Sequence, residues 1–346
     1  MLLFHNDYNE LCHPEVLRSI AENSPRQMDG YGEDEACRRA AALIRGKCGR
    51  EDMAVHFLVG GTQTNLTVID AALRPHQAVL GAASAHINVH ETGAVEATGH
   101  KVLSIPTADG KITANQVRDV LQAHLSDASR EHTAQPKMVY ISNPTELGTI
   151  YTRDELIAIS SVCRKYGLYL FVDGARLGYG LAARGNDVTM EDLAAYTDIF
   201  YIGGTKVGAM FGEAVVISNP ALQDDFRYLI KQHGAMLAKG WLLGLQFEAL
   251  FKDELYFNIS RHANLMADKL RYTLTNLGYS FYVPGVTNQV FPVLPDRLLE
   301  KLKENFTFSE QERVDENHRC IRFCTSWATK QENVQTLIDE LRRLCS

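Results

Sequence analysis

The stretch Leu168-Tyr169-Leu170-Phe171-Val172-Asp173-Gly174-Ala175-Arg176 decides the fold class of this chain of 346 residues. Its first five residues are apolar or aromatic without polar alternation, which is typical of a strand buried on both faces. Upstream, Thr152 and Glu155 form a capping box that predicts a helix running to about Tyr166, and Gly167 ends that helix. A helix followed directly by a fully buried strand is the repeating unit of α/β proteins.

The same alternation of helices and buried strands extends through the first 250 residues. Further strands are predicted in four apolar runs: Val55–Val59, Met138–Ser142, Ile199–Ile202 and Ala214–Ile217. Strands that lack polar alternation and are separated by helices predict a mostly parallel sheet covered by helices. We therefore expect a large α/β domain over residues 1–250, whose N-terminal segment packs on a second unit.

The last hundred residues have a different pattern, which predicts a smaller C-terminal α/β domain over residues 251–346. A helical pattern runs from about Arg261 to Leu277, and Thr329 with Glu332 is expected to cap a final helix. Three strands are predicted between them: Ser280–Val283, Gln289–Leu294 and Cys320–Thr325.

Composition limits the classes of function that this chain can have. It has 45 % hydrophobic residues and a net charge of −7, from 35 Lys plus Arg and 42 Asp plus Glu. This acidic balance argues against binding of nucleic acid or of an anionic membrane surface. Seven scattered cysteines without a metal-binding pattern predict free thiols in a reducing compartment and no metal site. We find no signal peptide and no membrane-spanning run, and expect a cytoplasmic protein.

The turn Gly60-Gly61-Thr62-Gln63-Thr64-Asn65 lies between a predicted strand and a helix. Glycines permit close approach of the backbone, and a helix N-terminus offers free N–H groups to an anion such as phosphate. The alternative is an ordinary strand-to-helix turn with Thr64 as the N-cap.

Asp173 and Arg176 follow a predicted strand directly, at the edge of the sheet where ligands bind in α/β proteins. Such an aspartate can hold a protonated ring nitrogen, and the arginine can bind a carboxylate. The alternative is a local Asp–Arg pair that caps a helix.

Lys206 lies among glycines in Gly203-Gly204-Thr205-Lys206-Val207-Gly208, which closes another predicted strand. An amine that must lose its proton to form an imine benefits from burial of this kind, whereas a solvated lysine does not need it. The spacing is not that of a nucleotide P-loop, and a lysine in a surface loop is the alternative.

Arg322 interrupts an apolar strand in Arg322-Phe323-Cys324-Thr325-Ser326-Trp327. A buried guanidinium needs an anionic partner. That partner is either a structural Asp or Glu or the carboxylate of a bound ligand.

Together these segments resemble the fold-type I pyridoxal-phosphate enzymes, which share the aspartate-aminotransferase fold, and specifically the threonine aldolase family of the β-eliminating lyases. Other matching segments follow: Asn6-Asp7-Tyr8, Tyr31-Gly32-Glu33-Asp34, and Ala85-His86-Ile87 with Glu91 and Gly93. The resemblance extends over nearly the whole chain and is most specific around Arg322.

The resemblance implies pyridoxal 5'-phosphate as cofactor, with Lys206 as the Schiff-base lysine. It further implies Asp173 on the pyridine nitrogen, His86 stacked on the ring, and the phosphate on Gly61 and Thr62. Thr205 is expected beside the cofactor.

For the carboxylate of an amino acid substrate, the resemblance implies Asn6, Arg176 and Arg322. Arg176 also stands close to the cofactor. Lys239 lies in Gly234–Gly240, a stretch in which relatives have an arginine that reaches the phosphate, and we expect it to substitute.

The proton of the β-hydroxyl group has two candidate bases. His86 is one. Glu146 is the other, in Asn143-Pro144-Thr145-Glu146, where relatives commonly have Asn-Thr-His. His90 could share the face of His86 and is otherwise structural.

The expected function is cleavage of L-threonine or L-allo-threonine to glycine and an aldehyde by a homodimer or homotetramer. Within the same class, another pyridoxal-phosphate-dependent lyase or an aminotransferase acting on a different amino acid is the alternative. From another class, the alternative is a binding module that has lost turnover. In an oligomer, Tyr31 could face a neighbouring subunit's cofactor.

Overall fold

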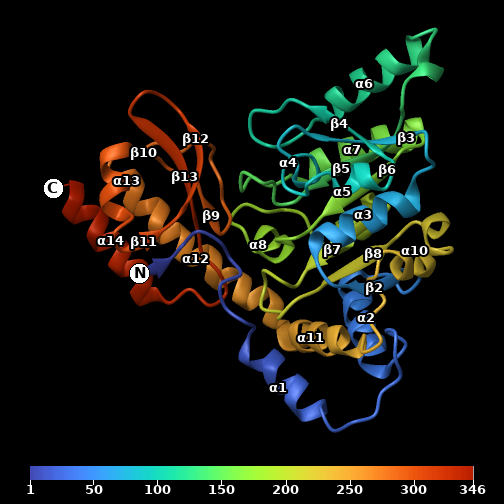
Figure 1. The fold of residues 1–346 in the computed structure, drawn as a ribbon, viewed down its shortest axis with the longest axis horizontal. Coiled ribbons are helices and arrows are strands. Elements are labelled where there is room, and N and C mark those ends of the chain that lie inside the picture. The colour runs from blue at the N-terminus through green and yellow to red at the C-terminus, as the bar shows by residue number, and fades with distance from the viewer. Residues whose placement is uncertain (346) are drawn as a thin grey trace.

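The computed structural model describes residues 1–345 and divides them between a large sheet unit and a smaller one (Figure 1). The large sheet has the order β2-β8-β7-β6-β5-β3-β4. Its strands are β2 (Ala54–Leu58), β3 (Gln77–Ala82), β4 (Lys101–Ile105), β5 (Gln135–Ser142), β6 (Tyr169–Asp173), β7 (Ile199–Gly203) and β8 (Glu213–Ile217). All neighbours pair in parallel except at β8, which is antiparallel to both β7 and β2. The prediction of a mostly parallel sheet is confirmed.

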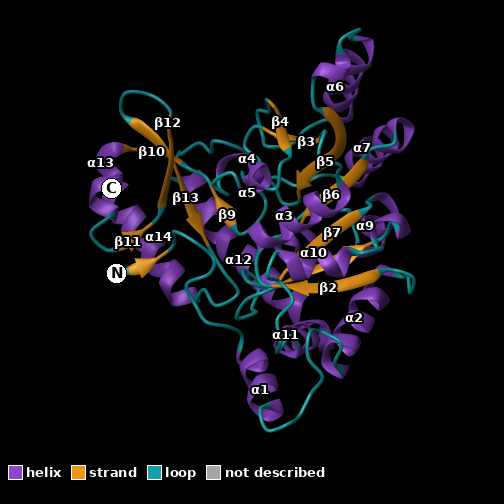
Figure 2. Ribbon diagram, turned by 45° about the vertical axis from the view of Figure 1, so that its right-hand side comes forward, coloured by secondary structure: helices purple, strands orange, loops and turns teal. Residues whose placement is uncertain are grey.

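Two sets of helices pack around this sheet (Figures 1 and 2). One set consists of α2 (Glu35–Cys48), α6 (Ala114–Ser126), α7 (Arg153–Tyr166) and α9 (Met190–Tyr196). The other consists of α3 (Gly61–Ala72), α5 (Ala94–Ala97) and α10 (Phe226–Gln232). The predicted capping box of α7 is confirmed, since the Thr152 hydroxyl accepts from Glu155 N–H and the Glu155 side chain accepts from Thr152 N–H.

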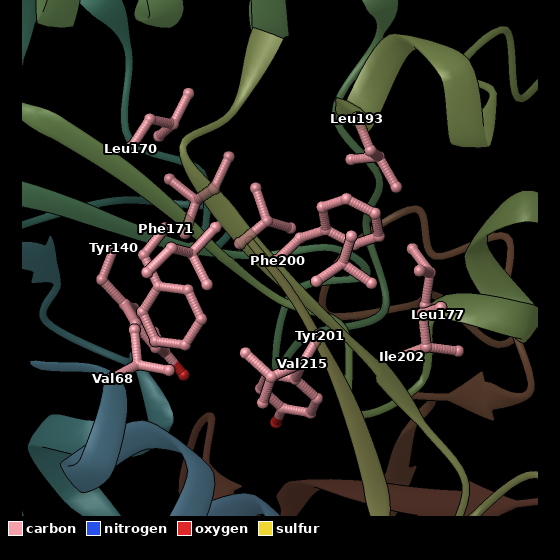
Figure 3. Packing of buried hydrophobic residues seen from close by; sticks show 14 of the residues in the cluster. Val68, Tyr140, Leu170, Phe171, Leu177, Leu193, Phe200, Tyr201, Ile202 and Val215 are labelled. Carbon is pink, nitrogen blue, oxygen red and sulfur yellow. The ribbon is translucent and has the colours of Figure 1, made fainter. Parts of the chain in front are cut away.

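Strands β3, β7 and β8 are buried along their whole length, and the side chains of the central strands form the main hydrophobic core. Figure 3 shows this core, in which Phe171 of β6 and Phe200 of β7 pack among aliphatic side chains. A purely apolar strand is stable only when both of its faces are covered, which explains the absence of alternation in the sequence.

The smaller unit has its own core, between α12 (Leu255–Asn276), α14 (Gln331–Cys345) and an antiparallel sheet. Its remaining elements are β9 (Gln289–Val290), β10 (Val293–Pro295), α13 (Asp296–Leu302), β11 (Phe306–Thr307), β12 (Ser309–Arg313) and β13 (His318–Cys324). At the other end of the chain, β1 (Leu2–Leu3) pairs in parallel with β11. Figure 1 shows this first strand among the last elements. Three further helices are α1 (Pro14–Asn23) and α11 (Trp241–Phe251), which pack against each other, and α8 (Leu177–Leu181), which packs against α12.

Two local predictions for the smaller unit are wrong. Residues 280–283 form no strand, and only Phe281 makes a single bridge, to Pro292. Thr329 does not cap α14, because its hydroxyl accepts the Ser326 N–H instead and so closes the preceding turn. Within residues 1–345, none of the helices combines the length and the apolar run needed to cross a bilayer.

Candidate active site

A cavity of about 330 Å³ lies at the carboxyl ends of the central strands. Seven of the residues that the sequence singled out line it: Gly61, Thr62, His86, Glu146, Asp173, Thr205 and Lys206. The others that line it are Tyr8, Val59, Gly60, Ala175, Tyr201, Phe211 and Glu213. Parallel strands bring their carboxyl ends to one edge, so segments far apart in the sequence meet there.

The Gly60-Gly61-Thr62 turn connects β2 to α3, which begins at Gly61. The alternative in which Thr64 is the N-cap is wrong, because Thr64 lies inside the helix and Gly60 is the cap residue. No side-chain oxygen caps this helix. Its first N–H groups therefore face the cavity without a competing carboxylate or hydroxyl, which suits an anion.

Asp173 ends β6 and accepts four hydrogen bonds. The hydroxyl groups of Tyr140 and Tyr201 donate to it at 2.5 Å each. The Asn65 amide donates at 3.1 Å and the Ala175 N–H at 2.9 Å. Figure 3 shows both tyrosine side chains among the residues of the hydrophobic core. Four donors fix the orientation of this carboxylate, the kind of group that can hold a protonated ring nitrogen.

Lys206 follows β7 in a tightly folded loop. The Thr205 hydroxyl accepts from Gly212 N–H at 3.0 Å, and the Lys206 carbonyl accepts the Tyr179 hydroxyl. The backbone is thus fixed on both sides of the lysine amine, which the half-buried side chain carries into the cavity. The structure therefore places Lys206 in the cavity and not on the surface.

His86 begins the short helix α4 (His86–Val89), and its Nδ1 lies 2.7 Å from Glu91 Oε1. Burial lowers the pKa of His86, but the hydrogen bond to Glu91 and the charges of Glu146 and Asp173 outweigh it, so that the pKa is raised. The hydrogen bond to Glu91 also fixes the orientation of the imidazole ring. His90 lies 5.5 Å from His86 between ring centroids and is exposed.

Four predicted residues do not line the cavity: Asn6, Arg176, Arg322 and Lys239. Asn6 accepts the Tyr8 N–H through its side-chain oxygen, which sets the direction of the chain beside the cavity-lining Tyr8. Lys239 is exposed, and in this single chain it does not reach the Gly61-Thr62 turn.

Arg176 is buried and pairs with Asp7, not with Asp173. Its Nε and Nη2 donate to the two carboxylate oxygens at 2.6 and 3.0 Å. The alternative of a local Asp–Arg pair is therefore wrong.

Arg322 has only neutral partners among residues 1–345. It donates to the His5 carbonyl at 3.1 Å and approaches the Ser309 hydroxyl at 3.4 Å. Its Nε is buried and has no hydrogen-bond partner. Among residues 1–345 no structural Asp or Glu pairs with Arg322, so that alternative is wrong. The other alternative, the carboxylate of a bound ligand, remains.

The sequence interpretation missed four residues of the site: Asp7, Tyr140, Tyr201 and Glu213. The two tyrosines lie in apolar strands and give the pattern of core residues. Asp7 lies within the motif Asn6-Asp7-Tyr8, and its partner is 169 positions away. Glu213 opens a strand, and its charge at the edge of an apolar run was the one available signal.

Comparisons with known proteins show which family and which fold this chain resembles. The model of the β-eliminating lyase family matches residues 18–294. A low-specificity L-threonine aldolase of Pseudomonas aeruginosa is 30 % identical over 344 residues, covering 97 % of this chain and 96 % of that protein. The solved structure of a Leishmania major threonine aldolase has a TM-score of 0.97 and 46 % identity, with both chains covered completely. A Thermus thermophilus aspartate aminotransferase mutant shares the fold, with a TM-score of 0.73 and 17 % identity over 99 % of this chain and 91 % of its own.

Proposed function

This chain belongs to the β-eliminating lyase family, and from that premise we propose that it cleaves L-threonine and L-allo-threonine to glycine and an aldehyde. The observation that carries the proposal is the cavity in which Lys206, Asp173, His86 and the Gly61-Thr62 turn lie together. The relatives from Pseudomonas aeruginosa and Leishmania major, both described as threonine aldolases, support the same reaction.

Enzymes of this family depend on pyridoxal 5'-phosphate, and the cavity suits that cofactor. The uncapped start of α3 would bind the phosphate, and Asp173 would hold the ring nitrogen protonated. The amine of Lys206 would hold the cofactor aldehyde, His86 would stack on the ring, and Thr205 would contact the cofactor. When bound, the cofactor supplies an electron sink for the bond that breaks at Cα.

The carboxylate of the substrate would bind Arg322, whose guanidinium has only neutral partners in the described chain. Arg176, held by Asp7 through Nε and Nη2, would offer its remaining N–H groups next to the same site, and Asn6 would donate through its amide. Fixing the carboxylate also orients the bonds at Cα, and this orientation selects the Cα–Cβ bond for cleavage.

Glu146 is the better candidate for the base that removes the β-hydroxyl proton. A carboxylate in the cavity accepts that proton directly, whereas the imidazole of His86 is held by Glu91 through Nδ1 and would stack on the cofactor ring. As the proton moves to Glu146, the β-oxygen becomes the aldehyde carbonyl and the Cα–Cβ bond breaks. A proton returned to Cα then completes glycine.

Lys239 enters the proposal through oligomerisation. Because it is exposed in one chain, it would reach a phosphate only in a homodimer or homotetramer in which subunits share sites. An amino acid remains the expected partner molecule, and the cytoplasm the expected location.

The test is product analysis of the purified protein with L-threonine, L-allo-threonine and L-tryptophan. We expect glycine and acetaldehyde from the first two and no product from the third. Lys206→Ala should abolish both cleavage and the visible absorbance of the protein, and Lys301→Ala, a change at an exposed lysine, should alter neither. Indole or a keto acid as the main product would instead favour the other lyase or the aminotransferase.

A further inference from the structure

Glu213 is a buried acid of the cavity for which the proposed reaction has no use. It is the first residue of β8, and it pairs with Gly203 of β7 on one side and with Leu58 of β2 on the other. Strand β7 leads to Lys206, and β2 leads to the Gly60-Gly61-Thr62 turn. The carboxyl group is therefore located between the lysine loop and the start of α3.

The surroundings of Glu213 are poor in compensating charge. Its side chain is 3 % exposed, and its Oε2 accepts one backbone N–H, from Gly204 at 3.0 Å. Four titratable side chains face it: Lys206 of the loop, Asp173 of β6, Tyr201 of β7 and Tyr256 of α12. Only Lys206 among them favours the ionised carboxylate.

Burial is the dominant influence on this acid, and it raises the pKa of Glu213 to about 8. The Thr205 hydroxyl, the Lys206 charge and the Gly204 N–H each lower the pKa without reversing that effect. At neutral pH the group is accordingly a neutral carboxylic acid.

We infer that Glu213 is a positioning residue for an anionic ligand. Glu213 keeps its proton so that a phosphate group can bind in the cavity that Glu213 shares with the Gly60-Gly61-Thr62 turn. The inference rests on the proposed function for the identity of that ligand, pyridoxal phosphate. An ionised carboxylate in this enclosed, weakly screened space would repel a phosphate dianion. Binding of the phosphate thus requires Glu213 to carry its proton.

The inference predicts that the affinity for pyridoxal phosphate depends on pH because of its phosphate group. Below about pH 8 the acid is already neutral, and above it each bound phosphate must be accompanied by uptake of one proton. The affinity for pyridoxal phosphate then falls about tenfold per pH unit above that value. Pyridoxal, which lacks the phosphate, does not acquire this dependence.

The experiment compares the full-length protein with Glu213→Gln, which has nearly the same shape and remains neutral. Affinities for pyridoxal phosphate and for pyridoxal are measured between about pH 7 and pH 9.5 by the change in absorbance. From the lower to the higher pH, the parent protein should lose ~30-fold more affinity for pyridoxal phosphate than Glu213→Gln does. The two proteins should have parallel profiles for pyridoxal. Any contribution of Lys206 to binding is common to both ligands and cancels in this comparison.

If both proteins bind pyridoxal phosphate and their pH profiles are equal, the role of Glu213 is overturned but the proposed function is not. Failure of both proteins to bind it at any pH would overturn the proposed function, and this inference with it.

A second measurement does not need the cofactor. Unfolding at about pH 6.5 should release one proton more from the parent than from Glu213→Gln, because the exposed acid ionises at its ordinary pKa. Relative to the variant, the stability of the parent should therefore fall as pH rises towards 8. Glu300→Gln, a change at an exposed glutamate of α13, should leave the proton release unchanged. Equal proton release from the parent and Glu213→Gln would refute the protonated state of Glu213.

Discussion

The guanidinium of Arg176 and the carboxylate of Asp7 form a buried two-bond ion pair, with N–O distances of 2.6 and 3.0 Å. Asn288 of the smaller unit also donates to Asp7, at 2.9 Å. One carboxylate thus connects the N-terminal segment, the loop after β6 and the smaller unit. Burial raises the pKa of Asp7, but Arg176, Lys206 and Asn288 together lower it to about 2.

Asp7→Asn should destabilise the protein by about 3 kcal/mol, because it leaves a buried guanidinium without its counter-charge. Chemical denaturation at neutral pH measures this free energy. In the parent protein, the stabilisation from ionised Asp7 is fully present above pH 3.8 and is lost as the pH falls through about 2.

Asp296→Asn is the matched control for Asp7→Asn. Asp296 also binds arginines, Arg313 and Arg319, but at the surface, where water screens the pairs. If Asp296→Asn destabilised the protein as much as Asp7→Asn does, burial would not be the reason for the large contribution of the Asp7–Arg176 pair to stability.

Gly174→Ala should destabilise the protein by about 3 kcal/mol or more, because a Cβ at this position would lie 1.9 Å from the carbonyl oxygen of Tyr201. The turn after β6 and strand β7 would have to separate, and Asp173 would move with them. Thermal unfolding and absorbance of the bound cofactor would record both effects.

Gly46→Ala is the same chemical change, but here we expect the opposite effect on the stability of the protein. Gly46 lies inside α2, and a Cβ there would meet nothing within 4 Å. The substitution should stabilise the protein by about 0.5–1 kcal/mol. Similar effects of the two substitutions would show that close packing is not what requires Gly174.

Arg322→Gln should raise KM for L-allo-threonine ~30-fold, corresponding to loss of about 2 kcal/mol of charge-assisted hydrogen bonding. The cleavage assay measures it over a range of substrate concentrations. Arg319→Gln changes an arginine on the same strand that binds Asp296 and Glu310 at the surface, and it should leave KM unchanged. An unchanged KM in Arg322→Gln would remove this residue from the carboxylate site.

Glu146→Gln should lower kcat for L-threonine ~10²–10³-fold with little change in KM, because the amide cannot accept the hydroxyl proton. Initial rates and the pH profile of kcat test this. Glu131→Gln, at an exposed position, serves as the control. Parental turnover in Glu146→Gln would return the role of base to His86.

The sequence predicts best those features that depend on local chemistry. The capping box of Thr152 and Glu155, the buried strand before Asp173 and the lysine loop after β7 are each set by neighbours in the chain. The loop of residues 280–283 was predicted less well, because one bridge to Pro292 and not a ladder orders it.

Contacts between distant segments are the part that local patterns do not contain. The hydroxyls of Tyr140 and Tyr201 bind Asp173 from the two strands that flank β6, namely β5 and β7. In the sequence, however, both residues look like ordinary core aromatics. The pairing of Arg176 with Asp7 depends on a fold that brings the N-terminal segment against the loop after β6.

The pairing of Leu2 with Phe306 has a consequence for synthesis on the ribosome. Domains generally begin to fold as they emerge, N-terminal part first. Leu2 and Phe4 leave the exit tunnel long before Phe306, so their partners on β11 are missing while the large sheet is already assembling. Closure of the smaller unit over these residues is accordingly a late event, and chaperones that bind nascent apolar segments have access to Leu2 and Phe4 until then.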